Sequence, residues 1–272
     1  MDPQAFLTEN RGEFPKDYDY DIQATKAWME ANWMKNCAAF VILYLVGIVV
    51  LKRYRENKEK LTCKGPLVLW NIGLAVFSII GATKIPPWLF YATSEKGFYY
   101  SVCSSSFYDE NRETSYWHFL FALSKVLELG DTVFLLLKKQ PLRFLHWYHH
   151  ITVLIFCWQS QSEHASTGLW FCSMNLVVHS IMYSYFASRT LGINVGRGVA
   201  MFITVLQILQ MVMGLALSLS AGFFKLLGIS CHVTPYNALL SVLMYISYLA
   251  LFVAFFRDSY LRKPKVDTKK DS

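Results

Sequence analysis

Three histidines within five residues are the part of this sequence best suited to chemistry. His146, His149 and His150 stand in the run Phe144-Leu-His-Trp-Tyr-His-His150, directly before a strongly apolar segment. On a helix, residues three and four positions apart share a face, so the three imidazoles are predicted to point the same way. A single histidine on an apolar helix is usually a hydrogen-bonded core residue. Three together indicate a site for a metal, a ligand or a reaction.

The composition predicts a membrane protein. The chain has 272 residues, of which 54% are hydrophobic and 16% aromatic, which is too apolar for an ordinary soluble domain. Crossing a bilayer takes roughly 17–25 helical residues. The stretches that meet or approach this length are about 36–51, 66–83, 116–137, 144–161, 168–188, 198–224 and 233–256. The first is short and is expected to begin earlier, with Trp33 and Lys35 at the membrane interface. We therefore expect an all-α polytopic membrane protein with seven transmembrane helices in 36–256, an N-terminal segment 1–35 and a basic tail 257–272.

Lysine and arginine are distributed unevenly over the predicted loops. Seventeen of the 26 fall in 52–64, 138–143, 189–197 and 257–272, and eight fall on the opposite side. Cytosolic loops are enriched in these residues, so the first set and the C-terminus are predicted to be cytosolic and the N-terminus lumenal. The net charge of +7 is then explained by topology and not by nucleic-acid binding.

Two of the six cysteines fall in loops on the predicted lumenal side. If that side is oxidising, Cys103 and Cys231 could form a disulfide that joins the two loops. The alternative is a pair of free thiols. The other cysteines are interpreted as small apolar side chains or reduced thiols.

Polar residues inside the predicted spans form stripes on four helices. The third span carries Lys125, Glu128, Asp131 and Thr132, the fifth Asn175, His179, Met182 and Tyr183, the sixth Thr204, Gln207 and Gln210, and the fourth the three histidines. Polar groups at membrane depth face the interior of a bundle, so the four stripes are predicted to surround a common polar site. Stripes of amides and threonines can also serve only to hold helices together.

Taken in order, these stripes resemble the four signature blocks of the ELO fatty acid elongases. The matching segments are Lys125-Val-Leu-Glu128-Leu-Gly-Asp131-Thr132, Gln140-Pro-Leu-Arg-Phe-Leu-His146-Trp-Tyr-His149-His150, Asn175-Leu-Val-Val-His179-Ser-Ile-Met182-Tyr183-Ser-Tyr185-Phe186 and Thr204-Val-Leu-Gln207-Ile-Leu-Gln210. The resemblance covers about residues 25–260. Trp147 and the segment Lys64-Gly-Pro-Leu-Val-Leu-Trp70 resemble the subgroup that extends saturated and monounsaturated chains. Phe186 stands where the family often has a second tyrosine.

The resemblance implies the condensing step of fatty acid elongation. An acyl-CoA and malonyl-CoA would give 3-oxoacyl-CoA, CoA and carbon dioxide, without a metal or other cofactor, beside a tunnel for the acyl chain. Separate reductases and a dehydratase would complete the cycle, since the chain has no glycine motif for a dinucleotide. The tail residues Lys269 and Lys270 resemble a dilysine retrieval signal, which would place the protein in the endoplasmic reticulum membrane. Whether the chain forms a homo-oligomer is left open.

A condensing reaction needs an acyl carrier and stabilisation of an enolate. No cysteine belongs to the polar stripes, and imidazole can itself be acylated. We predict that His149 carries the acyl group, with His179 and either His146 or His150 orienting it and stabilising the oxyanion or enolate. The predicted supporting residues are Lys125, Glu128, Asp131, Asn175, Tyr183, Gln207 and Gln210.

Basic residues near the predicted cytosolic mouth are candidates for binding the phosphates of CoA. They are Lys138, Lys139, Arg143, Arg189 and Lys263, which could equally be mere markers of topology. Lys125, inside a span, is favoured as the counter-charge of Glu128 and Asp131 over a contact with substrate.

Two other classes of protein share features with this sequence. Di-iron desaturases and hydroxylases also contain an HxxHH box, but they need more histidines than the seven here, of which His118 is isolated and His164 and His232 fall on the lumenal side. A single metal held by three histidines is a lesser alternative. A transporter or receptor with seven helices could also place polar stripes along a pathway.

Overall fold

The computed structural model describes residues 20–262, and every regular element in this range is helical. In chain order the elements are α2 (Ile22–Arg55), α3 (Lys64–Lys84), α4 (Pro86–Glu95), α5 (Phe98–Cys103), α6 (Phe107–Glu110), α7 (Arg112–Glu128), α8 (Gly130–Leu137), α9 (Phe144–Glu163), α10 (Gly168–Leu191), α11 (Arg197–Leu226), α12 (Pro235–Phe256) and a π-helical turn η1 (Arg257–Leu261). The predicted all-α fold is confirmed.

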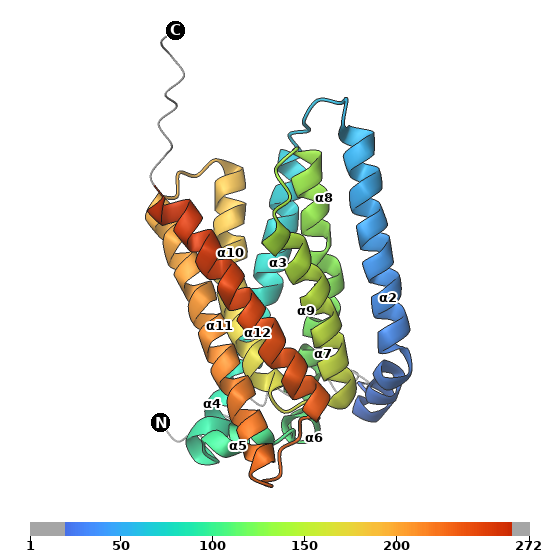
Figure 1. Ribbon diagram of the computed structural model, residues 1–272, viewed down its shortest axis with the longest axis vertical. Helices are drawn as coiled ribbons and strands as arrows, with labels where there is room; N and C mark the ends of the chain where they lie inside the picture. The colour runs from blue at the N-terminus through green and yellow to red at the C-terminus, as the bar shows by residue number, and fades with distance from the viewer. Residues whose placement is uncertain (1–19, 263–272) are drawn as a thin grey trace.

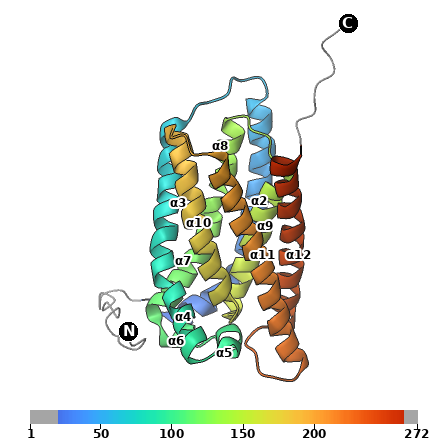
Figure 2. The same cartoon turned by 90° about the vertical axis from the view of Figure 1, so that its left-hand side faces the viewer.

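The long helices stand side by side in one elongated bundle, which Figures 1 and 2 show from two directions. Helix α3 packs along α10, α11 along α12, and α2 along α9. One end holds α4, α5 and α6 with the connections 164–167 and 227–234, and we call it the short-helix end. The other end holds the connections 56–63, 138–143 and 192–196 and the segment 257–262, and we call it the basic end.

The outer surface of the bundle is suited to lipid. Within residues 20–262, four stretches are long and apolar enough to cross a membrane, namely Ile22–Arg55, Lys64–Glu95, Arg197–Leu226 and Pro235–Leu261. Large apolar side chains such as Leu43, Leu69 and Leu239 are 67%, 72% and 57% exposed on their outer faces. Helices α7, α8, α9 and α10 run beside these stretches within the bundle (Figure 1). A polytopic membrane protein is therefore shown, while the count of seven spans stays a prediction.

The first long helix begins well before the expected span. Helix α2 starts at Ile22, directly after Asp21, whose side chain accepts a hydrogen bond from the backbone N–H of Ala24 at 2.9 Å. An aspartate in this place satisfies a free N–H at the helix start. The expected N-terminal segment 1–35 thus overlaps the first turns of this helix, in which charged and polar residues are interspersed with apolar ones and lower the hydropathy.

The third predicted span is interrupted. Helix α7 ends at Glu128 and α8 begins at Gly130, with a tight turn at Leu129. Gly130 lies against the ring of Trp70 on α3, and a Cβ at this position would come within 2.6 Å of that ring. The polar stripe predicted on this span is therefore divided between two helices, with Lys125 and Glu128 on α7 and Asp131 and Thr132 on α8.

The short-helix end is tied together by a disulfide and by backbone hydrogen bonds. Cys103 and Cys231 are joined with an S–S distance of 2.07 Å, across a sequence separation of 128 residues. The N–H of His232 donates to the carbonyl of Cys103, and the N–H of Ser166 donates to the carbonyl of His232. Three connections that are distant in sequence are therefore held at one end of the bundle. Cys37, Cys63, Cys157 and Cys172 are free thiols.

Candidate active site

Helix α9 places the three histidines at one side of a cavity. The helix begins at Phe144, directly after the extended residue Arg143, so all three lie in its first two turns. The rings of His146 and His150 are 4.5 Å apart between centroids, and those of His149 and His150 are 5.7 Å apart. The Nδ1 atoms of His149 and His150 are buried and have no hydrogen-bond partner among the described residues. The predicted clustering of imidazoles on one helix face is present in the structure.

Helix α10 places His179 on the facing side, held by a chain of polar contacts. Lys125 donates to the Oδ1 of Asn175 at 2.9 Å and to Glu128 at 2.6 Å. A lysine ammonium can only donate, so the Oδ1 of Asn175 must face it, and the amide NH₂ is left to donate to Nε2 of His179 at 3.1 Å. The proton of a neutral His179 ring therefore lies on Nδ1, which is 3.9 Å from Glu128.

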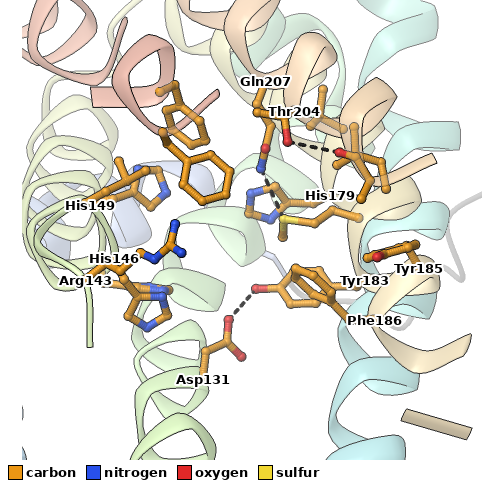
Figure 3. Close-up of a pocket in the computed structure, with 18 of the residues that line it drawn as sticks. Asp131, Arg143, His146, His149, His179, Tyr183, Tyr185, Phe186, Thr204 and Gln207 are labelled. Atoms are coloured by element: carbon orange, nitrogen blue, oxygen red, sulfur yellow. Dashed lines mark hydrogen bonds between the residues drawn. The ribbon is translucent and has the colours of Figure 1, made fainter. Parts of the chain in front are cut away.

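Asp131, the second residue of α8, accepts hydrogen bonds from two other helices. The indole N–H of Trp70 donates to one carboxylate oxygen at 2.6 Å, and the hydroxyl of Tyr183 donates to the other at 2.8 Å. These contacts join α3, α8 and α10 at the edge of the cavity. Figure 3 shows the bond between Asp131 and Tyr183.

These side chains surround a cavity of about 580 Å³. Figure 3 shows His146 and His149 on one side of it and His179 and Tyr183 on the other, with Gln207 and Thr204 above them. Its polar lining residues are Glu128, Asp131, Gln140, Arg143, His146, His149, His150, Asn175, His179, Tyr183, Tyr185, Thr204, Gln207, Gln210 and Tyr260. The remaining lining is mostly apolar, from residues such as Ile203, Met211 and Phe252. Polar and apolar surfaces thus meet in one cavity.

Nearly all of the predicted catalytic and supporting residues come together here. The exception is Lys125, which is 1% exposed and lies behind Glu128, with its ammonium 4.2 Å from the ring centre of Phe121. It is the partner of Glu128, as favoured from the sequence, but the direct partners of Asp131 are Trp70 and Tyr183. Gln207 contacts the sulfur of Met182 at 3.4 Å, and Gln210 is buried against the cavity.

The candidate CoA-binding residues are less closely grouped. Arg143 lines the cavity at the basic end and lies over the ring of Phe255. The ammonium of Lys139 instead donates to the carbonyl of Glu56, and Lys138 and Arg189 do not line the cavity. Lys263, Lys269 and Lys270 lie outside the described residues.

Neither a free cysteine nor a group of potential metal ligands was found at the cavity among the described residues. Cys157 and Cys172 lie on α9 and α10, but neither lines the cavity. Within residues 20–262, no group of three or more His, Cys, Asp and Glu side chains is arranged so that it could hold a metal ion.

Several residues at the site were not predicted from the sequence. Trp70 was noted for its subgroup resemblance and not for a contact with Asp131, and Tyr44 of α2 was not noted at all, although its hydroxyl contacts Thr132 at 2.7 Å. Tyr260 lines the cavity from beyond the last predicted span. Single aromatic residues in apolar helices give no periodic signal, so only the packing reveals them. The sequence indicates only that each of these residues carries a hydroxyl or an indole N–H, which needs a hydrogen-bond partner when it is buried.

The fold and the site together define a class of protein, an all-α membrane protein that encloses a cavity lined by histidines. The family model described as ELO: GNS1/SUR4 family matches residues 28–268. The chain is 43% identical over 253 residues to very long chain fatty acid elongase 6 of Drosophila melanogaster, covering 91% of this chain and 79% of that protein. It is 42% identical to the human protein of the same name, over 98% and 99% of the two chains. It is 38% identical to mouse very long chain fatty acid elongase 3, over 93% of each. The chain belongs to the ELO family.

Proposed function

We propose that this protein condenses a long-chain acyl-CoA with malonyl-CoA to give 3-oxoacyl-CoA, CoA and carbon dioxide. The relatives reported above are named very long chain fatty acid elongases. The observation that carries the proposal is the cavity, in which four imidazoles from two helices share one space with an apolar lining. The resemblance of Trp147 and of the segment 64–70 to the subgroup that extends saturated and monounsaturated chains supports substrates of that kind. The net reaction neither oxidises nor reduces its substrates, so it needs no redox cofactor.

The first half-reaction is acyl transfer to His149. His149 lines the cavity and its Nδ1 is buried without a hydrogen-bond partner among the described residues, so we assign the attack to Nε2. Nε2 attacks the thioester carbonyl, a C–N bond forms and the C–S bond breaks. CoA leaves as a thiolate and takes up the proton that the acylated ring loses. The developing negative charge on the carbonyl oxygen is stabilised by neighbouring N–H donors.

The second half-reaction forms the carbon–carbon bond. Malonyl-CoA loses carbon dioxide, and the electron pair remains on its second carbon as an enolate. This carbon attacks the acyl carbonyl, the new C–C bond forms, and the C–N bond to His149 breaks. The departing ring nitrogen takes up one proton from solvent and returns to neutral imidazole, so that the full cycle consumes one proton. Donors from His179 and either His146 or His150 stabilise the enolate oxygen.

The position of the cavity suggests how the substrates enter. Arg143 at the basic end is placed to meet a CoA phosphate, and the acyl chain would continue along the apolar lining toward the short-helix end. The charge distribution supports a cytosolic basic end and a lumenal short-helix end in the endoplasmic reticulum membrane. Separate reductases and a dehydratase would act on the product.

The proposal is tested with purified protein in lipid nanodiscs, supplied with acyl-CoA and radiolabelled malonyl-CoA. We expect 3-oxoacyl-CoA and carbon dioxide in equal amounts, and loss of both in His149→Ala. The matched control is His232→Ala, because this histidine lies at the short-helix end, outside the cavity. No product from the wild-type protein would contradict condensation and favour a transporter or receptor, whereas a desaturated acyl chain would favour an oxidative enzyme.

A further inference from the structure

A chain of hydroxyl groups connects the first long helix to His146. The hydroxyl oxygen of Tyr44 on α2 lies 2.7 Å from Oγ1 of Thr132, which lies 2.9 Å from Nε2 of His146. Tyr44 and Thr132 are buried, with 8% and 1% of their surfaces exposed. Helix α2 contributes no residue to the lining of the cavity. Tyr44 therefore reaches the site only through Thr132.

Only one orientation of the hydrogens along Tyr44, Thr132 and His146 gives every hydroxyl hydrogen an acceptor. The hydroxyl of Tyr44 has one hydrogen, and Thr132 is its hydrogen-bond partner within the described residues, so this hydrogen must point at Oγ1 of Thr132. The single hydrogen of Thr132 is then directed to Nε2 of His146, which must accept it. In a neutral imidazole with Nε2 as acceptor, the ring proton lies on Nδ1.

The opposite direction leaves a group unsatisfied. If His146 donated from Nε2 to Thr132, and Thr132 donated to Tyr44, the hydrogen of Tyr44 would be buried without an acceptor. A buried donor without an acceptor destabilises the folded protein, and the first arrangement contains no such donor. The contacts of Tyr44 therefore decide which nitrogen of His146 carries the proton.

We propose that Tyr44 is a positioning residue that holds His146 in its Nδ1–H form through Thr132, so that His146 acts in the condensation as a hydrogen-bond donor and not as a base. This inference rests on the proposed function. Nδ1 of His146 has no partner in residues 20–262, and the ring lines the cavity, so its N–H is free to meet a substrate oxygen that becomes negatively charged. His149 then remains the residue that bonds to the acyl group.

The tautomer itself can be measured without substrate. Protein labelled with ¹⁵N-histidine is placed in nanodiscs, and the nitrogen signals of His146 are assigned by their loss in His146→Gln. The proposal predicts a protonated Nδ1 and an unprotonated Nε2 in the wild type, with Nε2 becoming partly protonated in Tyr44→Phe. The control is Tyr54→Phe on the same helix, since Tyr54 is 61% exposed and remote from Thr132, and it should leave the signals unchanged. A protonated Nε2 in the wild type overturns the proposal.

Kinetics test whether this tautomer matters for the reaction. Tyr44→Phe is expected to lower kcat by about 10- to 100-fold, the range found when the hydrogen-bond partner of a metal-bound histidine is removed, while KM for malonyl-CoA stays the same. Adding Tyr44→Phe to Thr132→Val should lower kcat no further, because the two act through one chain. Unchanged kcat in Tyr44→Phe, with or without a lower Tm, overturns the proposal. Absence of condensation in the wild type would instead contradict the proposed function, and the nitrogen signals would still report the tautomer.

Discussion

At the scale of single residues, the site depends on side chains that fix the direction of hydrogen bonds. Lys125 has no surface in the cavity, yet its inability to accept a hydrogen bond orients Asn175, which in turn sets the tautomer of His179. The spacing in the sequence predicts that Lys125 pairs with Glu128, and the structure shows this ion pair. Its effect on Asn175 follows from a contact between α7 and α10 that no spacing in the sequence specifies.

Asp131 is a second residue that acts by fixing its neighbours. We expect Asp131→Ala to destabilise the protein, because the N–H of Trp70 and the hydroxyl of Tyr183 lose their shared acceptor at a cost of roughly 1–3 kcal/mol each. Asp131→Asn keeps one acceptor oxygen, which can still face Trp70, and should lose about half as much. Thermal unfolding in detergent measures the difference. Equal Tm values for the two variants would show that these hydrogen bonds do not determine stability.

At the scale of helices, the sequence predicted the elements that have a periodic or apolar signal. Helix α3 begins at Lys64, close to the expected residue 66, and α9 begins at Phe144 as expected. The first span was expected to begin before residue 36, but its start at Ile22 was not located, although Asp21 is a recognisable N-cap residue. Hydropathy alone cannot locate a start in a segment where polar and apolar residues alternate, since the cap stabilises that start.

The interruption between α7 and α8 shows a different limit of sequence reasoning. Gly130 could have suggested a break, but an isolated glycine within a helical pattern is often tolerated. The close approach of the Trp70 ring explains why this position has no side chain. The break and the bond from Trp70 to Asp131 belong to the same contact between α3 and α8, which depends on tertiary packing. The polar stripes therefore predicted which residues meet, while the aromatic residues that hold them required the structure.

At the scale of the whole molecule, the two ends of the bundle differ in chemistry. At the basic end Arg143 lines the cavity, whereas the short-helix end is tied by the bond between Cys103 and Cys231. A disulfide is typical of an oxidising compartment, and basic loops are typical of the cytosolic side. The disulfide and the basic loops are independent features, and both support a cytosolic basic end and a lumenal short-helix end.

Cys63 provides a direct reporter of this orientation. It is a partly exposed free thiol directly before α3, at the basic end. A maleimide that cannot cross membranes should label Cys63 in sealed vesicles of endoplasmic reticulum whose cytosolic face is outward, without added detergent. Cys63→Ser should lose the label, which shows that the signal comes from this thiol. Labelling only after the vesicles are opened would place the basic end in the lumen and contradict the proposed topology.

The central claim, that His149 carries the acyl group, is tested most directly in a single turnover without malonyl-CoA. Purified protein is mixed with excess acyl-CoA and quenched, released CoA is counted, and the peptides are examined by mass spectrometry. We predict one CoA released per active site and an acyl group on the peptide that contains His149. Both should be absent in His149→Ala and present in His232→Ala. An acyl-enzyme that forms equally well in His149→Ala would contradict the account.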